Sequence, residues 1–244
     1  MKVLTTIFSL LFATFTLFAQ SVNANFEVDE QGWTSHFTGY PASEESYSRL
    51  SVEWSKIIPP FASRGGLSFV GRNYGNPIFL YIQKEVEGLL PNTNYRVMFN
   101  MDWIYQMEPE TVPIFVKVGA LNKEPELTDL CEIVASFDKG KIGQDGRDFK
   151  VVGQLTPNEF GYPFRKNLQN YENTLSVDTD AEGRLFLMIG IEPESGDTEN
   201  VFLNTLRVVL AENGAAQEVS NILPEEESLH QSDLEEETEE QTTQ

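Results

Sequence analysis

The feature that most constrains the fold is a series of short runs in which apolar and polar residues alternate with a period of two. Gly, Pro, Asn and Asp separate these runs, and no long stretch follows the helical period of 3.6. The clearest runs are 78–86, 95–103, 114–120, 149–155, 174–177, 185–191 and 202–210, and weaker ones are 37–40, 49–54 and 67–70. About eight to ten short strands with regularly spaced turns predict an all-β sandwich.

The run 95–103 shows the alternation most clearly. Tyr95, Val97 and Trp103 fall on one side of such a strand, which we expect to face the core, whereas Asn100 and Asp102 fall on the other. The link 90–94 contains Pro, which presets φ, and Asn, which tolerates a left-handed conformation. The sequence therefore predicts that 78–86 and 95–103 form a hairpin.

The chain begins with features of a secretory signal peptide. Lys2 precedes an apolar run from Val3 to Ala19, which falls short of the ~20 apolar residues of a membrane-spanning helix. Cleavage after Ala24 and cleavage after Ala19 both suit the small residues there. We assign 1–24 to the signal peptide and expect a secreted or periplasmic protein of a bacterial envelope, with no membrane span after cleavage.

The charge is unevenly distributed along the chain. The formal net charge is −21, and 11 of the acidic residues lie in 212–244, which has no Lys or Arg. Such a segment buries too little apolar surface to offset its ordering entropy, so we expect an acidic disordered tail after a β-sandwich domain at 25–211. An acidic body also repels phosphate, which excludes nucleic acid as a partner. Cys131 is the only cysteine, so no disulfide within the chain can staple the domain.

Three segments resemble a known fold family. Asn25-Phe26-Glu27 with Gln31-Gly32-Trp33, the segment 88–97 around Leu90-Pro91-Asn92-Thr93-Asn94-Tyr95, and Leu203–Val208 resemble galactose-binding-like jelly-roll domains of the carbohydrate-binding-module type. The body, with its segment from Trp33 to Pro41, also resembles an uncharacterised group of secreted bacterial proteins. The resemblance implies a jelly-roll β-sandwich that binds a polysaccharide or another glycan.

The same resemblance implies a structural calcium ion. In this family a carboxylate near the first strand and acidic residues near the last strand hold the metal. Glu27 matches the first position, and Asn204 stands where an acidic residue is frequent. Calcium takes six to eight oxygen ligands, so these two residues with backbone carbonyls would supply part of the shell.

The candidate ligand contacts combine polar and aromatic side chains, because sugar C–H faces pack on rings and hydroxyls need paired donors and acceptors. A solvated outer face would carry the same polar residues, so both interpretations stay open. Aromatic platforms are expected in loops or at strand ends, with Tyr105 and Tyr162 as further choices. The ligand-binding candidates are Arg96, Asn100, Asp102, Lys117, Tyr74 and Trp54.

Nothing in the sequence establishes an enzyme. His36 and His230 are the only histidines, and His36 has no Gly-x-Ser-x-Gly motif to accompany it as a catalytic triad would. Zinc sites need clustered His or Cys, which are absent from the sequence. We therefore expect a secreted, non-catalytic carbohydrate-binding domain. The alternatives are a cell-surface or matrix module that binds an envelope protein, and a polysaccharide-active jelly-roll enzyme.

Overall fold

The computed structural model describes residues 19–44, 49–73, 75, 78–129, 132–194 and 196–213. The regular secondary structure of these residues consists of strands and one 3₁₀ turn, η1, at Ala42–Glu44. No helix among them is long and apolar enough to cross a membrane. The strands are β1 (Ala19–Asn25), β2 (Thr34–Thr38), β3 (Tyr40–Pro41), β4 (Ser51–Lys56), β5 (Gly65–Asn73), β6 (Phe79–Val86), β7 (Asn94–Tyr105), β8 (Ile114–Leu121), β9 (Leu127–Asp129), β10 (Glu132–Ala135), β11 (Phe149–Leu155), β12 (Phe164–Gln169), β13 (Leu175–Asp178), β14 (Leu185–Pro193) and β15 (Gly196–Glu212).

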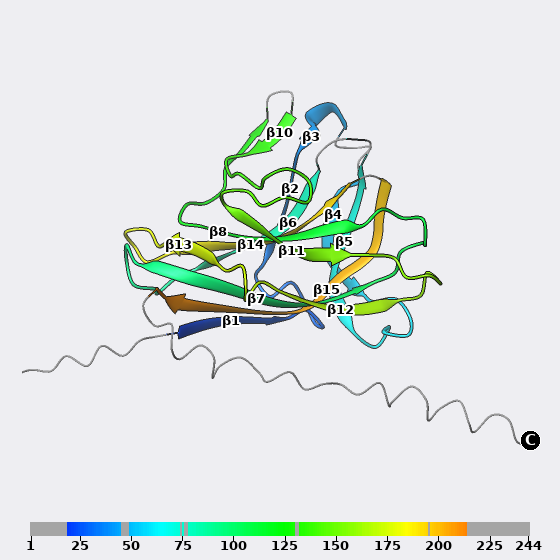
Figure 1. Ribbon diagram of the computed structural model, residues 1–244, viewed down its shortest axis with the longest axis horizontal. Helices are drawn as coiled ribbons and strands as arrows, with labels where there is room; N and C mark the ends of the chain where they lie inside the picture. Colours follow the sequence, from blue (N-terminus) through cyan, green and yellow to red (C-terminus); the bar gives the residue numbers. More distant parts are fainter. Residues whose placement is uncertain are drawn as a thin grey trace, which may run out of the picture.

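Two antiparallel sheets face each other and form a sandwich (Figure 1). Sheet A has the order β12-β7-β15-β5-β4, with β1 also paired to β15 and β13 also paired to β7. Sheet B has the order β11-β8-β14-β6-β2. A small sheet, β3-β10-β9, projects from the top of the sandwich in the view of Figure 1.

The strand order is that of a jelly roll. The long strands alternate between the sheets, because β5, β7 and β15 belong to sheet A while β6, β8 and β14 belong to sheet B. The late strand β15 returns to lie between β5 and β7, and β14 likewise lies between β6 and β8. Antiparallel strands interleaved in this way over two sheets define the jelly roll, so the predicted fold class is confirmed.

The predicted hairpin between 78–86 and 95–103 is wrong. Its strands exist as β6 and β7, but they lie in different sheets, so the link 87–93 crosses the sandwich edge. The turn residues behave as expected, with Asn92 in the left-handed region at φ 49°. The link packs against the 179–183 turn through backbone hydrogen bonds, one of which runs from the Leu89 N–H to the Gly183 carbonyl at 3.1 Å. The residues of the link thus predicted that the chain turns here, but they did not predict that the next strand joins the other sheet.

The core lies between the two sheets and follows the predicted alternation. The inward residues of β7, from Tyr95 to Tyr105, are buried, and Trp103 is fully buried against Phe69. On the facing sheet, β8 and β14 contribute apolar side chains at every second position. The core members from these two strands are Ile114, Val116, Val118, Ala120, Leu185, Leu187, Ile189 and Ile191.

The outer face of sheet B is also covered. Phe79, Tyr81, Phe149 and Met188 form a second apolar cluster there, and Phe137 packs on it from the segment that precedes β11. That segment, residues 136–148, closes on itself through backbone hydrogen bonds between its two ends. Sheet B is therefore buried on both sides near β8 and β14, unlike a sheet with one solvated face.

The first strand begins before the predicted domain boundary at residue 25. β1 pairs with β15 over its whole length, from Ala19 opposite Ala211 to Asn25 opposite Thr205. At the other end, β15 extends one residue past 211, to Glu212. Residues 1–18 and 214–244, on which most of the predicted signal peptide and the predicted acidic tail fall, lie outside the described residues.

Candidate functional site

The outer face of sheet A carries a polar surface, which we define as Asn100, Asp102, Arg165, Asn167, Tyr171 and Thr205. β7 supplies Asn100 and Asp102, and β12 aligns Asn167 opposite Asp102. Asn167 donates to the Asn100 side-chain oxygen at 2.7 Å, and Asn100 donates to the Tyr171 hydroxyl at 3.0 Å. The predicted outward orientation of Asn100 and Asp102 is confirmed, and each is bonded to neighbours on the same face.

Asp102 is the charged centre of this polar surface. Its Oδ2 accepts from Arg165 at 2.7 Å and from Thr205 at 2.9 Å. Burial raises the pKa of Asp102, but hydrogen bonds from Arg165, Asn167 and Thr205 outweigh it and hold the pKa below its ordinary value. The carboxylate is therefore ionised at neutral pH, with much of its hydrogen-bonding capacity already used.

Arg96 lies on the same face but apart from the polar surface. Asn100 lies four positions further along β7, a distance of about 13 Å in a strand. Between them Met98 packs with Val209 and with the Tyr171 ring, so an apolar row interrupts the polar one. Arg96 and Asp102 thus do not converge on one small site.

Lys117 does not lie on this face. The expectation that it contacts the same ligand as Arg96, Asn100 and Asp102 is therefore wrong. β8 belongs to sheet B, on the other side of the sandwich from β7. The Lys117 side chain is 0% exposed; its ammonium group forms an ion pair with Glu192 at 2.8 Å and donates to the carbonyls of Lys139 and Lys141 at 2.9 and 2.8 Å. Burial lowers the pKa of Lys117, and the adjacent Glu192 carboxylate opposes that shift. The Lys117 ammonium group is therefore held within the fold by two carbonyls and one carboxylate.

The two predicted aromatic contacts have different outcomes. Trp54, on β4, is half-buried, and its indole N–H donates to the Phe26 carbonyl at 2.9 Å, which ties β4 to the segment after β1. Lys56 lies 5.8 Å from the centre of the Trp54 ring. Tyr74 lies outside the described residues.

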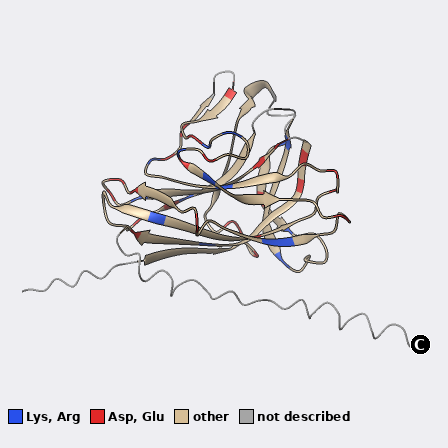
Figure 2. Cartoon of the chain, viewed as in Figure 1, with Lys and Arg blue, Asp and Glu red and all other residues tan. Residues whose placement is uncertain are grey.

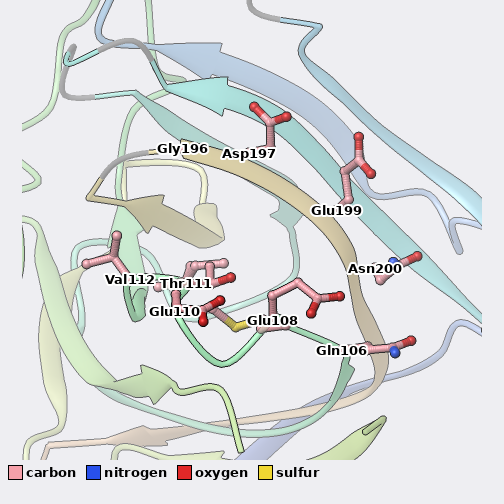
Figure 3. A pocket seen from close by; sticks show the side chains of 11 residues that line it. Gln106, Glu108, Glu110, Thr111, Val112, Gly196, Asp197, Glu199 and Asn200 are labelled. Atoms are coloured by element: carbon pink, nitrogen blue, oxygen red, sulfur yellow. The ribbon is translucent and has the colours of Figure 1, made fainter. Parts of the chain in front are cut away.

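A cleft of about 630 Å³ opens at the end of the sandwich where β7 ends and β15 begins (Figure 3). Glu108 and Glu110 lie on the β7–β8 loop, and Asp197 and Glu199 lie on β15 (Figure 3). In Figure 2, red segments mark the start of β15 at the right-hand end of the sandwich. We call this the acidic cleft; it is lined by Gln106, Met107, Glu108, Glu110, Thr111, Val112, Ile114, Gly196, Asp197, Glu199 and Asn200.

A local irregularity in β15 builds one wall of the acidic cleft. Between Thr198 and Val201 the register of β15 against β5 shifts, because two residues of β15 oppose one of β5. Such a bulge reorients side chains, and here it contains Glu199 and Asn200. Asn200 adopts a φ of 56°, and its carbonyl accepts from the Gln106 N–H at 3.0 Å, which joins the two walls.

Arg72 affects one of the four carboxylates. Its guanidinium forms a two-pronged ion pair with Asp197 across β5 and β15. The hydrogen bond from Arg72 lowers the pKa of Asp197 despite the opposing effect of desolvation. Arg72 offsets only one of the four negative charges, so the acidic cleft keeps a net negative charge at neutral pH.

An aromatic loop, residues 156–163 between β11 and β12, lies beside the acidic cleft. Phe160 and Tyr162 are 72% and 66% exposed, and their rings stack with centroids 5.7 Å apart at 25°. Asn158 holds the loop in shape, since its side-chain oxygen accepts from the Phe160 and Tyr162 N–H groups at 3.1 and 3.0 Å. The backbone that carries the exposed rings is thus fixed by hydrogen bonds to the Asn158 side chain and not by burial of the rings.

Contacts at Gly161 join the aromatic loop to the acidic cleft. The Gln106 side-chain amide donates to the Gly161 carbonyl at 2.9 Å. A Cβ placed on Gly161 would lie 3.5 Å from Pro109 and 3.7 Å from a Glu108 carboxylate oxygen. Gln106 and Glu108 both line the acidic cleft, so the stacked rings and the carboxylates belong to one region of the surface.

The predicted calcium ligands are neighbours in the fold. Asn204 is fully buried and donates to the Gly65 carbonyl at 2.8 Å, while its main-chain carbonyl accepts from Phe26 N–H, next to Glu27. The Asn204 side-chain oxygen is buried without a hydrogen-bond partner among the described residues. One unsatisfied buried oxygen is the only observation that favours a cation.

The remaining donors fall short of a calcium shell. Glu27 pairs with Arg64 at 3.7 Å, which places a cationic side chain beside the only predicted carboxylate. The described residues contain no group of three or more His, Cys, Asp or Glu side chains arranged to hold a metal ion. Because calcium needs six to eight oxygens, this donor set does not fit it, and we derive no role for the ion.

The contacts of His36 lie within sheet B. It belongs to β2, where its ring stacks on Tyr81 at 5.3 Å and bonds to Thr34 at 3.0 Å. Burial lowers the pKa of His36, and Glu124 partly opposes that shift. Its hydrogen bond to Thr34 is a local contact on β2, and His36 does not line the acidic cleft.

Comparisons with known proteins find similarity at a low level to several solved structures. No family model and no curated protein matches it. It is similar to the xylan-binding domain CBM22-1 of Paenibacillus barcinonensis Xyn10C, with 13% identity, a TM-score of 0.39 and coverage of 78% of this chain and 93% of that one. TmCBM61, solved with β-1,4-galactotriose, shows 15% identity, a TM-score of 0.35 and coverage of 75% and 92%.

A third similar structure is the K3 cleaved adhesin domain of Lys-gingipain from Porphyromonas gingivalis. It shows 12% identity and a TM-score of 0.36, and the match covers 78% of this chain and 98% of that domain. Carbohydrate-binding modules are thus among the structures that this chain resembles, as the sequence resemblance predicted. With TM-scores this low, the strand order of the chain itself defines the fold.

Proposed function

We propose that this protein is an exported, non-catalytic glycan-binding jelly roll whose ligand lies in the acidic cleft against the aromatic loop. The observation that carries the proposal is the pair of stacked, exposed rings, Phe160 and Tyr162, held beside a cleft lined by carboxylates and amides. Single exposed aromatic residues are ordinary on protein surfaces. Two stacked rings beside a polar cleft form a surface suited to a ligand that has both apolar faces and hydroxyl groups.

Each part of this surface meets one property of a sugar. The C–H face of a pyranose packs on an aromatic ring, which removes apolar surface from water. Its hydroxyls donate to carboxylates and pair with side-chain amides, and bonds to charged acceptors are the stronger ones. Glu108, Glu199, Gln106 and Asn200 supply such groups along the acidic cleft.

The charge of the acidic cleft limits the class of glycan. Three carboxylates beyond the Arg72–Asp197 pair line it, and the sequence as a whole is strongly acidic. Bringing a uronate or a sulfate ester into this field is unfavourable. We therefore expect the ligand to be a glycan without acidic groups.

Native affinity electrophoresis of the purified secreted protein tests the proposal. The protein is run through gels that contain neutral polysaccharides, and through matched gels that contain acidic ones. We expect slower migration in at least one neutral glycan, and no retardation in acidic glycans. Failure to be retarded by any glycan would contradict the proposal.

Alanine variants then locate the binding surface. Replacing both Phe160 and Tyr162 should weaken binding by about tenfold or more, equal to about 1.4 kcal/mol, because central aromatic contacts dominate such interfaces. Leu90→Ala is the matched control, since Leu90 is also exposed but precedes β7 at the opposite end of the sandwich. If Asn100→Ala and Asp102→Ala abolish binding while the aromatic variant retains it, the polar surface of sheet A is the binding site instead.

A second candidate function is protein interaction at a cell surface or matrix. The small β3-β10-β9 sheet projects from the sandwich and exposes Leu127 and Val134, at 42% and 45%. Such a projection suits an envelope-protein partner. Pull-down from envelope extracts that Leu127→Ser abolishes, without any glycan binding, would favour this function. Release of shortened products from a bound glycan would instead favour a polysaccharide-active enzyme.

A further inference from the structure

Strand β1 is an integral part of sheet A. Its register with β15 is continuous over seven residues, with no bulge or slip. Val22 lies opposite Val208 and Ala24 lies opposite Leu206, both on the core side of the sheet. Ala24 is only 5% exposed. The segment therefore contributes backbone hydrogen bonds and core packing.

Removing residues before Asn25 would leave the edge of β15 unpaired. β5 pairs with the first part of β15, up to Leu203, and β1 occupies the corresponding position along 205–211. On the core side of that half lie Leu206, Val208 and Leu210, which are almost fully buried. Without β1 these side chains would lose neighbours, and the exposed strand edge would become a template for pairing with other chains.

This requirement separates the two cleavage points that the sequence allows. A cut after Ala24 removes six of the seven β1 residues from Ala19–Asn25, whereas a cut after Ala19 removes one residue at the strand's exposed end. We propose that the precursor is cut between Ala19 and Gln20, so that the mature protein begins at Gln20 and keeps β1. Water hydrolyses this peptide bond, giving a carboxylate on Ala19 and an amine on Gln20. Ala19 supplies the small residue that signal peptidases require before the cut.

The direct test is the mass of the exported protein. The full precursor, residues 1–244, is expressed in a bacterium that exports it, and the mature protein is purified and measured by intact mass and N-terminal sequencing. The expected product begins at Gln20. A product that begins at Asn25, or one that retains Met1, would overturn the proposal.

A second measurement tests the structural reason separately. Chains that comprise residues 20–244 and 25–244 are produced without the leader, and their thermal unfolding is compared. We expect the shorter chain to unfold at least about 5 °C lower, or to fail to fold. Equal melting temperatures would refute the claim that β1 stabilises the sandwich. Neither result depends on whether the protein binds a glycan.

Discussion

Replacing Glu192 by glutamine tests how the charges on the outer face of sheet B are held. Glu192, on β14, is 0% exposed and forms an ion pair with Lys117 at 2.8 Å, while Lys139, 15% exposed, pairs with its other oxygen. Glutamine keeps the shape but removes the negative charge, which leaves the buried Lys117 ammonium without a counter-ion. Losing one partner of a buried ion pair costs about 3 to 5 kcal/mol, and we expect the free energy of unfolding to fall by that amount.

The double variant distinguishes a coupled pair from two independent residues. Replacing Lys117 by methionine and Glu192 by leucine removes both buried charges and keeps the volume nearly constant. Lys139 is partly exposed and can turn to solvent. We expect the double variant to lose about 1 to 3 kcal/mol less free energy of unfolding than Lys117→Met alone and Glu192→Leu alone lose in sum, because neither buried charge is left without a partner.

Urea unfolding followed by tryptophan fluorescence measures these free energies by linear extrapolation. The matched control is Glu85→Gln on β6, which removes a carboxylate from an exposed contact with Arg184 at 3.6 Å and should leave stability nearly unchanged. Two results would refute the reasoning: a loss for Glu192→Gln below about 1 kcal/mol, or a double variant whose loss equals the sum of the singles. Either would mean that water reaches the charges and screens them.

Two further predictions concern Asp102 and calcium. Asp102→Asn should lower the free energy of unfolding by about 1 to 2 kcal/mol at neutral pH. Because the folded pKa of Asp102 is depressed, its contribution is fully present above the ordinary carboxyl pKa and is lost as the pH falls through the folded value. The denaturation curves of the two proteins should therefore begin to converge below about pH 4 and coincide at still lower pH. A difference that persists at lower pH would contradict that charge-based origin. For calcium, the short donor set leads us to expect the same melting temperature in calcium and in chelator; a rise with calcium that Glu27→Gln abolishes would instead establish a site at Glu27 and Asn204.

The alternation of residues predicted most strands, because burial on one face is written locally in a strand. The strong runs correspond to β6, β7, β8, β11, β13, β14 and β15, and the weak ones to β2 with β3, β4 and β5. β12 was missed, since Phe164–Gln169 contains Arg, Lys and two amides and pairs at the edge of sheet A with only Leu168 in the core. β1 was missed because the same residues also fit the end of a signal peptide.

Pairing between strands was predicted less well than the strands themselves. Period two states which residues share a face of one strand, but it does not state which sheet the strand joins. Lys117 and Asp102 both alternate with apolar residues, yet β8 and β7 lie in opposite sheets. A charged residue fits at position 117 because a loop folds over sheet B. Lys139 and Lys141, more than 20 positions away, supply two carbonyls to the Lys117 ammonium group, and Lys139 also pairs with Glu192.

The acidic cleft shows why a site is harder to predict than the fold that carries it. Its walls come from the β7–β8 loop and from β15, which are about 90 positions apart in the sequence, and they meet only because the jelly roll sets β7 beside β15. The bulge that presents Glu199 and Asn200 leaves no trace in hydrophobic periodicity. The sequence named Tyr162 as a candidate aromatic platform because it lies among Asn, Gly and Pro residues, but its stacking on Phe160 and the Asn158 hydrogen bonds that shape the loop have no signal in the sequence. The core of such a domain is determined residue by residue, whereas its binding surface is determined by which strand ends the topology brings together. The variants of Phe160 and Tyr162 test that surface directly.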